Sequence, residues 1–248
     1  MNIVISTVKR PGGSNYLDRC INSIRQDYNG HIFLIVGGKD TAYTDKYTDG
    51  FSKVFIGAEE GLLRDGVQKA GLGYATALRT VAEDPEPTLI IEDDAVFVEG
   101  WYKKLQNLIN LVETQHYVIS LISPWAGSTP LPNIDTPSLQ PFLYTARLSY
   151  GAIGEFPVAN VITWSNTTAI YYPPSVLKSR LADFIERFVV NDEGVYDLVA
   201  GYWFMRMNIP IYVAVPNLLL GVDTSDSAMG STIKRFHVNY EDWDWKRW

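Results

Sequence analysis

The sequence predicts an α/β fold in which a mostly parallel β-sheet is flanked by helices. Short runs of β-branched and other apolar residues alternate with segments whose apolar residues recur every three to four positions. Chains that alternate strand and helix in this way usually form a parallel sheet with helical crossover connections. The 248 residues and the hydrophobic content of 46% allow a substantial core, which excludes a chain that is mainly disordered.

The first half of the chain carries most of this signal. Apolar runs predict strands over residues 3–8, 32–36, 53–56, 88–91 and 117–122. Helical spacing of apolar residues predicts helices over residues 16–24, 71–82 and 101–112. Asn15 precedes the first helix as its N-cap, with Asp18 three residues further on.

The second half is less regular. Residues 124–160 are rich in proline and show little periodicity, which is typical of a functional loop or lid. Regular structure is expected again in four further segments, over residues 161–172, 173–188, 193–208 and 211–215. No internal repeat or low-complexity linker interrupts the chain, so we expect one domain over residues 1–248.

Composition excludes several classes of protein. The single cysteine, Cys20, rules out an internal disulfide and a multi-cysteine metal site. The formal net charge of -7 disfavours a surface made mainly for nucleic-acid phosphates. No unbroken apolar stretch reaches the roughly 20 residues of a membrane-spanning helix, and the N-terminal segment MNIVISTVKR is unlike a signal peptide. We therefore expect a soluble, cytoplasmic protein.

Three consecutive acids, Glu92, Asp93 and Asp94, are the strongest functional signal. They follow directly on the predicted strand over residues 88–91, and ligands of open α/β sheets bind just beyond the carboxyl ends of strands. Clustered carboxylates repel one another, and Mg²⁺ or Mn²⁺ with a phosphate-bearing substrate would balance their charge. A solvated acidic turn explains the same residues, and their spacing does not separate the two interpretations.

The order of these features resembles glycosyltransferases with the GT-A fold. In that family the first strand ends in a polar turn that meets the nucleotide, as Ser6 to Arg10 would here. The second strand often ends near an acid that reads the base, for which Asp40 is the candidate. An alanine-rich helix, here residues 73–82, then precedes an acidic DxD-type motif, here residues 92–94.

Within that family the resemblance is closest to the branch that includes the N-acetylglucosaminyltransferases that add antennae to N-glycans. An EDD motif in a similar apolar frame, an Asp that opens a later helix and a proline-led segment are shared with it. The corresponding segments here are residues 196–199 and 215–219.

The resemblance implies a GT-A-type fold with a Rossmann-like, mostly parallel central sheet and flanking helices. Residues 1–123 would bind the nucleotide sugar, with UDP as the expected nucleotide, and residues 124–248 would bind the acceptor. The acceptor needs a free hydroxyl group and stays open among a saccharide, a metabolite, a protein and a modified nucleic-acid base.

The resemblance also implies a set of donor-binding residues at the ends of the first, second and fourth strands and on the alanine-rich helix. These residues are Thr7, Val8, Arg10, Asp40, Arg79, Glu92 and Asp93. Lys9 is expected near the diphosphate together with the two arginines, and Arg64 and Lys69 are the alternatives to these basic residues.

A metal ion, Mn²⁺ or Mg²⁺, is the cofactor that the resemblance implies, bound by Asp94 with or without Asp93. The N-glycan branch usually carries a histidine after the proline-led strand, where this sequence has Gly221. The further ligand could be Asp223, His237, water or none.

An inverting transferase needs a general base for the acceptor hydroxyl. Asp197 best matches the family position, with Glu193 and Asp192 as alternatives. Acids in the first turn of a helix are also favoured by the helix dipole, which explains all three without catalysis.

Aromatic residues make up 13% of the chain, and sugar rings stack on aromatic side chains. Trp125, Tyr150 and Trp164 lie where the family places acceptor contacts, so we expect them to bind the acceptor.

Two other functions compete with a glycosyltransferase. A sugar nucleotidyltransferase normally has a glycine-rich, lysine-bearing loop after the first strand, and the short Pro11-Gly12-Gly13 lacks that pattern. A non-catalytic protein that binds a sugar or a nucleotide is the other alternative, because Gly221 leaves the metal site in doubt.

Overall fold

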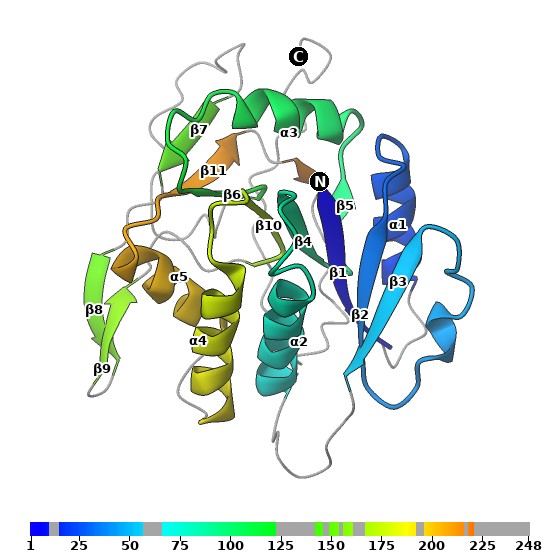
Figure 1. The fold of residues 1–248 in the computed structure, drawn as a ribbon, viewed down its shortest axis with the longest axis horizontal. Coiled ribbons are helices and arrows are strands. Elements are labelled where there is room, and N and C mark those ends of the chain that lie inside the picture. Colours follow the sequence, from blue (N-terminus) through cyan, green and yellow to red (C-terminus); the bar gives the residue numbers. More distant parts are fainter. Residues whose placement is uncertain are drawn as a thin grey trace.

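An eight-stranded β-sheet forms the centre of the computed structural model, and helices cover both of its faces (Figure 1). The strand order is β3-β2-β1-β4-β10-β6-β11-β7. The structure describes residues 1–9, 15–56, 66–122, 142–145, 149–153, 156–160, 167–191, 196–215 and 218–220.

The strands of the central sheet come from almost the whole length of the chain. They are β1 (Asn2–Val8), β2 (Ile32–Gly37), β3 (Phe51–Ile56), β4 (Thr88–Glu92), β6 (Val118–Ser120), β7 (Phe142–Thr145), β10 (Ala169–Tyr172) and β11 (Ile211–Val215). Two small antiparallel pairs lie outside this sheet, formed by β5 (Val96–Phe97) with β12 (Leu219–Leu220), and by β8 (Ser149–Ile153) with β9 (Phe156–Asn160).

The central sheet is mostly parallel. Strands β3, β2, β1 and β4 are parallel neighbours, and β6 is parallel to β11. Strand β10 lies between β4 and β6 and is antiparallel to both, while β7 is antiparallel to β11. The carboxyl ends of β1, β2 and β4 therefore meet at one edge of the sheet.

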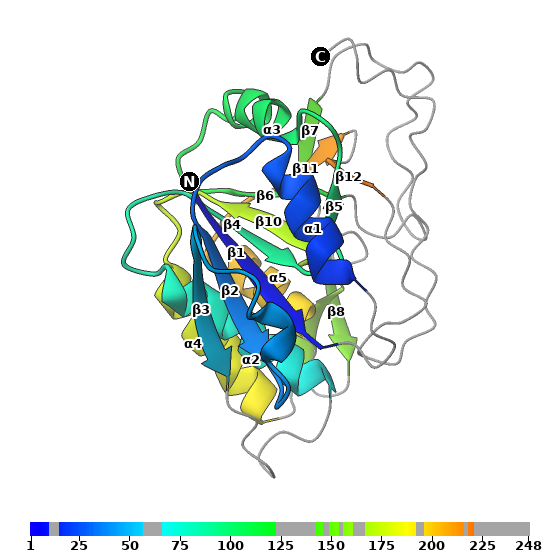
Figure 2. The ribbon, with the colours of Figure 1, turned by 90° about the vertical axis from the view of Figure 1, so that its right-hand side faces the viewer.

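The helices form one layer on each face of the sheet (Figures 1 and 2). Helices α1 (Tyr16–Arg25) and α3 (Trp101–Ile109) pack on one face, and α2 (Gly66–Thr80), α4 (Lys178–Val190) and α5 (Tyr196–Arg206) pack on the other. A short 3-10 helix, η1 (Ala42–Thr44), lies in the connection between β2 and β3. None of the helices in the described parts of the chain combines the length and the apolar composition that crossing a membrane requires.

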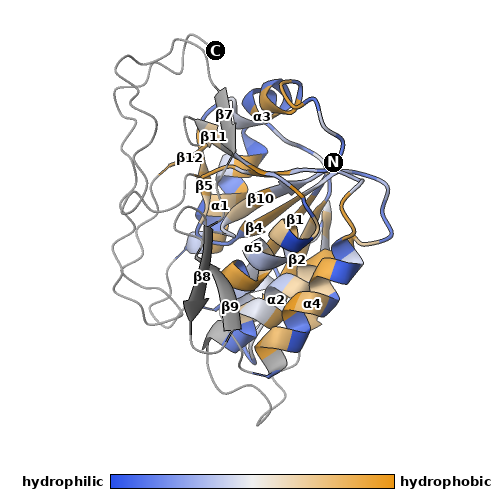
Figure 3. Ribbon diagram, turned by 90° about the vertical axis from the view of Figure 1, so that its left-hand side faces the viewer, coloured by the Kyte–Doolittle hydropathy of each residue, from blue (hydrophilic) through white to orange (hydrophobic). Residues whose placement is uncertain are grey.

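Alternation along the strands supplies two hydrophobic cores, one for each face. In β1, Ile3 and Ile5 join the core under α1 and α3, whereas Val4 joins the core under α2, α4 and α5. In β4, Ile91 and Ile90 divide in the same way. Figure 3 shows the strands as largely hydrophobic and α2 and α4 as hydrophobic and hydrophilic by turns, as expected of helices with one face in a core.

The strands and helices predicted for the first half of the chain are confirmed, with ends shifted by a few residues. The prediction for residues 124–160 is partly wrong, because β7, β8 and β9 lie in that segment. Strand β7 pairs with β11, and β8 pairs with β9. Such pairing stabilises a strand even where its sequence lacks the alternation of apolar and polar residues that predicts one. The antiparallel insertion of β10 was also not predicted, because strand order depends on contacts between residues far apart in the chain.

Helix α2 passes very close to α4 and α5 at Gly71. A Cβ atom added there would lie 2.5 Å from Val189 Cγ2 and 3.1 Å from Tyr196 Cβ. Two residues further on, a Cβ atom at Gly73 would meet only Ile56 Cδ1, at 3.9 Å. The helices can approach this closely at position 71 only because the residue is a glycine. At position 73 there is room for a larger side chain.

We expect Gly71→Ala to lower the free energy of unfolding by about 1–3 kcal/mol, because the added methyl group overpacks the contact with Val189. Gly73→Ala is the matched control, and its better helix propensity should raise that free energy by up to about 1 kcal/mol. Thermal or urea unfolding of the two variants measures both effects. Equal stability of the two variants would contradict the close contact at Gly71.

Lys178, in the first turn of α4, has a buried ammonium group with few favourable polar contacts. Its side chain is 2% exposed, and its Nζ has no hydrogen-bond partner among the described residues. Burial lowers the pKa of Lys178, and the negative charge of Asp84 offsets part of this effect. The ammonium group is therefore less stable in the fold than in water.

Replacing this amine by an apolar group of similar shape should stabilise the protein. We expect Lys178→Met to raise the free energy of unfolding by about 1–3 kcal/mol near neutral pH. The pKa of Lys178 is lower in the folded than in the unfolded state, where it is about 10.4. The folded wild type therefore loses this proton first, and its free energy of unfolding rises with pH until the unfolded-state value is reached. The advantage of the variant should therefore shrink as pH rises toward about 10, and a series of thermal-unfolding measurements in steps of about one pH unit tests this. A variant less stable than the wild type would contradict this account.

Candidate functional site

The candidate site lies at the edge of the sheet where β1, β2 and β4 end. Parallel pairing aligns Ser6 of β1 with Glu92 of β4, so the residues that follow these two strands are neighbours. Helix α5 leads into β11, which runs in the same direction as β1 and β4. The amino end of α5 is consequently brought to this edge as well.

Asp93 forms the centre of one half of the site. Its carboxylate is 3% exposed and accepts a hydrogen bond from Thr7 Oγ1 at 2.7 Å and one from the backbone N–H of Val8 at 3.4 Å. Tyr43 Oη in turn donates to Thr7 Oγ1 at 3.2 Å. The structure thus brings together three residues that the sequence assigned to donor binding, Thr7, Val8 and Asp93.

Glu92 lies on the opposite side of the sheet from Asp93, because successive residues of a strand point to opposite faces. Glu92 Oε1 accepts hydrogen bonds from Tyr196 Oη at 2.8 Å and from Thr167 Oγ1 at 3.0 Å. The three acids of the motif therefore do not form one carboxylate cluster. One of them is engaged with α5 and another with the end of β1.

Asp94 completes the motif, and its side chain is partly buried. Burial raises the pKa of the nearby Cys20 thiol, and the negative charges of Asp93 and Asp94 raise it further, which places both carboxylates near this buried side chain. No group of three His, Cys, Asp or Glu side chains within the described residues could hold a metal ion.

A divalent cation bound together with a substrate stays a prediction for this edge of the sheet. Mg²⁺ and related hard ions are commonly held by one or two carboxylates plus substrate phosphates, without a complete protein cage. Asp94 is the acid of the motif that the sequence predicted for this role, and Asp93 beside it accepts hydrogen bonds from Thr7 and Val8. The other predicted metal residue, His237, lies outside the described residues.

A hollow of about 110 Å³ opens beside Asp93, between the end of β1, the start of α1 and the connection from β2 to β3. Cavities of this size class admit one small ring. Its lining residues are Thr7, Val8, Lys9, Asn15, Tyr16, Leu17, Asp18, Tyr43, Lys46, Tyr47 and Asp93.

A network around Asp18 holds one wall of this hollow. Lys46 Nζ lies 2.6 Å from Asp18 Oδ2, and Tyr47 Oη donates to Asp18 Oδ1. Burial raises the pKa of Tyr47, and the hydrogen bond to Asp18 raises it further, so the hydroxyl keeps its proton and acts as the donor. The sequence assigned Asp18 only to the first turn of α1, yet its side chain is tied to the β2–β3 connection.

At the rim of the hollow Lys9 forms an ion pair with Asp40. The hydrogen bond from Lys9 holds the pKa of Asp40 below its ordinary value. Asp40, which the sequence assigned to reading the base, therefore lies beside the first strand with a positive charge next to it. This pair is exposed and open to a ligand.

Sequence reasoning missed Tyr43, Lys46 and Tyr47. All three belong to the segment TAYTDKY, which directly follows Asp40. Two tyrosines just after a strand that ends at a ligand-binding edge were the available signal. Their contribution depends on how the β2–β3 connection folds back toward α1, which sequence spacing does not reveal.

Asp197 lies in the first turn of α5 at the same edge as the acidic motif. The backbone N–H of Leu198 donates to Asp197 Oδ1 at 2.7 Å. Tyr196, the neighbouring residue, reaches Glu92 as described above. The structure thus brings Asp197 to the side of the sheet that carries Glu92, and its role as the general base stays a prediction.

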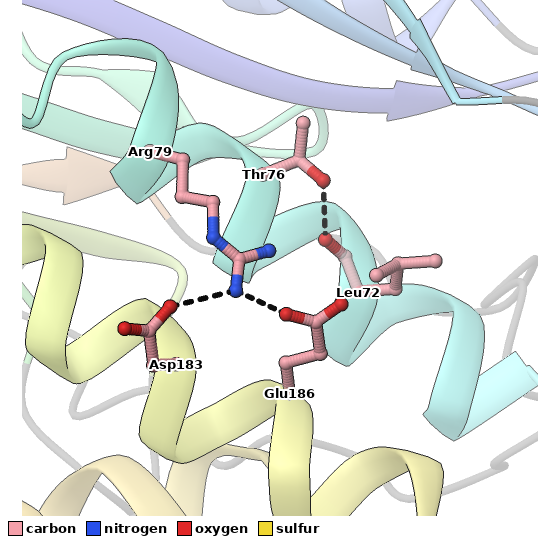
Figure 4. Close-up of polar contacts among 5 residues, drawn as sticks. All are labelled: Leu72, Thr76, Arg79, Asp183 and Glu186. Atoms are coloured by element: carbon pink, nitrogen blue, oxygen red, sulfur yellow. Dashed lines mark hydrogen bonds and ion pairs between the residues drawn. The ribbon is translucent and has the colours of Figure 1, made fainter.

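Arg79 lies elsewhere. It belongs to the last turn of α2, and because α2 runs against the direction of β3 and β4, this turn lies at the opposite edge of the sheet. Its guanidinium pairs with Asp183 at 2.8 Å and with Glu186, both on α4 (Figure 4). The structure does not bring Arg79 together with the other predicted donor residues, and it gives Arg79 a role in joining two helices.

The side chains of the other predicted site residues lie outside the described part of the structure. Tyr150 lies in β8, of which only the backbone is described. Six others lie outside the described residues, namely Arg10, Trp125, Trp164, Asp192, Glu193 and His237. Their assigned roles stay predictions.

The Asp18 network predicts an acid-dependent loss of stability. Burial by itself raises the pKa of Asp18, but the hydrogen bonds from Lys46 and Tyr47 outweigh it and lower that pKa. The stabilising carboxylate is therefore fully present above the unfolded-state value of about 3.9 and is lost as pH falls through the lower folded-state value.

Because this pair is partly exposed, we expect Asp18→Asn to lower the free energy of unfolding by only about 0.5–1 kcal/mol at neutral pH. The difference from the wild type should shrink once pH falls below the unfolded-state value of about 3.9 and be lost as pH falls through the lower folded-state pKa. Melting temperatures over this range measure it, with Asp49→Asn, an exposed acid before β3, as the control. A constant difference at every pH would contradict the role given to the carboxylate.

No protein-family model matches the chain, and no curated protein matches its sequence. Among solved structures, the crystal structure of S. aureus TarS 1-349 is similar over 88% of this chain, with a TM-score of 0.52 and 15% sequence identity. The match covers 59% of TarS 1-349, so this chain spans less than two thirds of that structure.

A second solved structure, 4-diphosphocytidyl-2C-methyl-D-erythritol synthase from Anaerococcus prevotii DSM 20548, is matched over 88% of this chain and 89% of that one. Its TM-score is 0.49 and its sequence identity is 11%. The likeness to TarS, a glycosyltransferase, concerns the fold. The predicted fold class is confirmed: the chain has a GT-A-like α/β fold with a mostly parallel central sheet and flanking helices.

Proposed function

We propose that this protein is a glycosyltransferase that moves a sugar from a nucleotide-sugar donor to a hydroxyl group of an acceptor, with a UDP-linked sugar as the donor. The observation that carries the proposal is the junction of Asp93 with Thr7 beside a ring-sized hollow, at the carboxyl edge of a GT-A-like sheet. Ligands of open α/β sheets bind at this edge.

The nucleotide base would occupy the hollow beside Asp93. Tyr43 and Tyr47 line it and offer aromatic surface for a flat ring, and Thr7 and Val8 supply its polar floor through their contacts to Asp93. Lys9 and Asp40 at the rim offer a donor and an acceptor for the edge of the base. These groups are chemically suited to a nucleotide.

The diphosphate would lie above Asp94, with Arg10 from the end of the first strand as its predicted basic partner. Asp94 would hold a Mn²⁺ or Mg²⁺ ion together with the diphosphate oxygens. When bound, such an ion supplies positive charge that stabilises the departing nucleoside diphosphate.

Asp197 would act as the general base. The acceptor oxygen bonds to the anomeric carbon while the bond from that carbon to the diphosphate oxygen breaks, and the electron pair leaves with the diphosphate. The hydroxyl proton passes to the Asp197 carboxylate. This single displacement inverts the configuration of the anomeric carbon. Glu193 and Asp192 are the alternative bases, and Trp125, Tyr150 and Trp164 the proposed acceptor contacts.

A thermal-shift series with UDP, GDP, CDP and TDP, each with and without Mn²⁺, tests the donor half of the proposal. A ligand present at 100 times its Kd stabilises a protein by about 2.7 kcal/mol, which raises the melting temperature of a chain of this size by about 5–10 °C. We expect UDP with Mn²⁺ to give this shift. Asp94→Asn should remove the metal-dependent part, whereas Asp49→Asn, at the other edge of the sheet, should keep it.

Turnover tests the chemistry itself. With a UDP-linked sugar and a panel of acceptors, we expect release of UDP that depends on Mn²⁺ and falls at least 100-fold in Asp197→Asn. Release of pyrophosphate from a nucleoside triphosphate and a sugar phosphate would instead indicate a nucleotidyltransferase. Binding of a nucleotide without any turnover would indicate a binding protein, and either result would overturn the proposal.

A further inference from the structure

Tyr196 joins α5 to the acidic motif at the end of β4. It is the first residue of α5, is 5% exposed, and donates a hydrogen bond from Oη to Glu92 Oε1 at 2.8 Å. Thr167 Oγ1 donates to the same carboxylate oxygen at 3.0 Å. Two buried hydroxyl groups from different segments thus converge on one atom of Glu92.

Burial and the neighbouring negative charges keep the Tyr196 hydroxyl protonated, so it is the donor in this hydrogen bond. Burial raises the pKa of Tyr196 well above its ordinary value, and the negative charges of Glu92 and Asp197 raise it further. The hydroxyl therefore keeps its proton and donates it in the hydrogen bond to Glu92. Hydrogen bonds to a carboxylate are among the stronger ones in proteins.

Glu92 is itself held firmly by the sheet. Its backbone N–H donates to Thr168 O at 2.8 Å, and the residue pairs with Ser6 in the parallel register of β4 and β1. The neighbouring residue Ile91 pairs with Ala169 of β10. Strands on both sides of β4 therefore fix the position of this carboxylate relative to the next two acids of the motif.

The ring of Tyr196 is packed from the other side by α2. Its centroid lies 5.6 Å from that of Tyr74, whose hydroxyl lies 2.6 Å from the hydroxyl of Tyr172. Gly71 leaves room for the side chain of Tyr196, because a Cβ at position 71 would lie 3.1 Å from Tyr196 Cβ. The start of α5 is thus packed against α2 and joined by a hydrogen bond to β4.

We infer that Tyr196 is a positioning residue: its hydrogen bond to Glu92 sets the first turn of α5, and with it Asp197, relative to Asp93 and Asp94. Asp197 directly follows Tyr196, so a rotation or shift of this turn moves both residues together. The inference rests on the proposed function, in which Asp197 takes the acceptor proton. It also gives Glu92 a structural task, whereas the sequence assigned it to the donor.

Tyr196→Phe removes the hydroxyl and keeps the ring, which makes it the sharpest test. A misplacement of about 1 Å can reduce a rate about 100-fold, so we expect the kcat of sugar transfer to fall about 10- to 100-fold. The KM for the donor should stay within about two-fold, because the nucleotide contacts lie on the other face of the sheet. Hydrogen–deuterium exchange over residues 196–206 should become faster.

Tyr74→Phe is the matched control. It removes one buried hydroxyl from the Tyr74–Tyr172 pair and leaves the Tyr196–Glu92 hydrogen bond in place. Its melting temperature should fall about as much as that of Tyr196→Phe, whereas its kcat should stay within about two-fold of the wild type. This comparison separates positioning from a general loss of stability.

The possible failures are distinguishable. A wild type that transfers no sugar overturns the proposed function, while faster exchange of α5 in Tyr196→Phe would still support the anchoring of that helix. Unchanged exchange in Tyr196→Phe, or a kcat loss no larger than that of Tyr74→Phe, overturns the positioning role. A variant that melts below the assay temperature is compared by exchange at a lower temperature, where faster exchange confined to α5 supports the role and uniform exchange overturns it.

Discussion

The parallel pairing of β1 with β4 is the constraint on which the candidate site depends. It aligns Ser6 with Glu92, so that Thr7 and Asp93, one residue further along each strand, face each other and form a hydrogen bond of 2.7 Å. The same register sends Glu92 to the opposite face of the sheet, where it meets α5. A shift of one residue would exchange these faces and separate both contacts.

The acidic motif therefore works as a junction between the two faces of the sheet. Asp93 belongs to the face that carries α1 and the hollow, and Glu92 belongs to the face that carries α2 and α5. In the proposed reaction the donor nucleotide uses the first face and the general base comes from the second. The motif lies between them, where the two substrates have to meet.

Much of the fold followed from the sequence, because its signals are local. Alternating apolar runs and helical spacing predicted β1, β2, β4, α1 and α3, and the position of three acids after a strand predicted a site at the edge of the sheet. The sequence predicted less well those contacts that join residues far apart in the chain. The family resemblance assigned Arg79 to the diphosphate, yet the direction of α2 places it at the other edge of the sheet, where α4 supplies two carboxylates.

The sequence by itself determined the strands and helices of the first half of the chain and the acids at the end of β4, since each depends on residues close together in the chain. Only the tertiary structure decided which acid faces which partner. Tyr43 reaches Thr7, and Tyr196 reaches Glu92 across 104 positions of sequence. Such contacts depend on strand register and helix packing, which are set by the burial of both hydrophobic cores together and therefore cannot be read from any one segment.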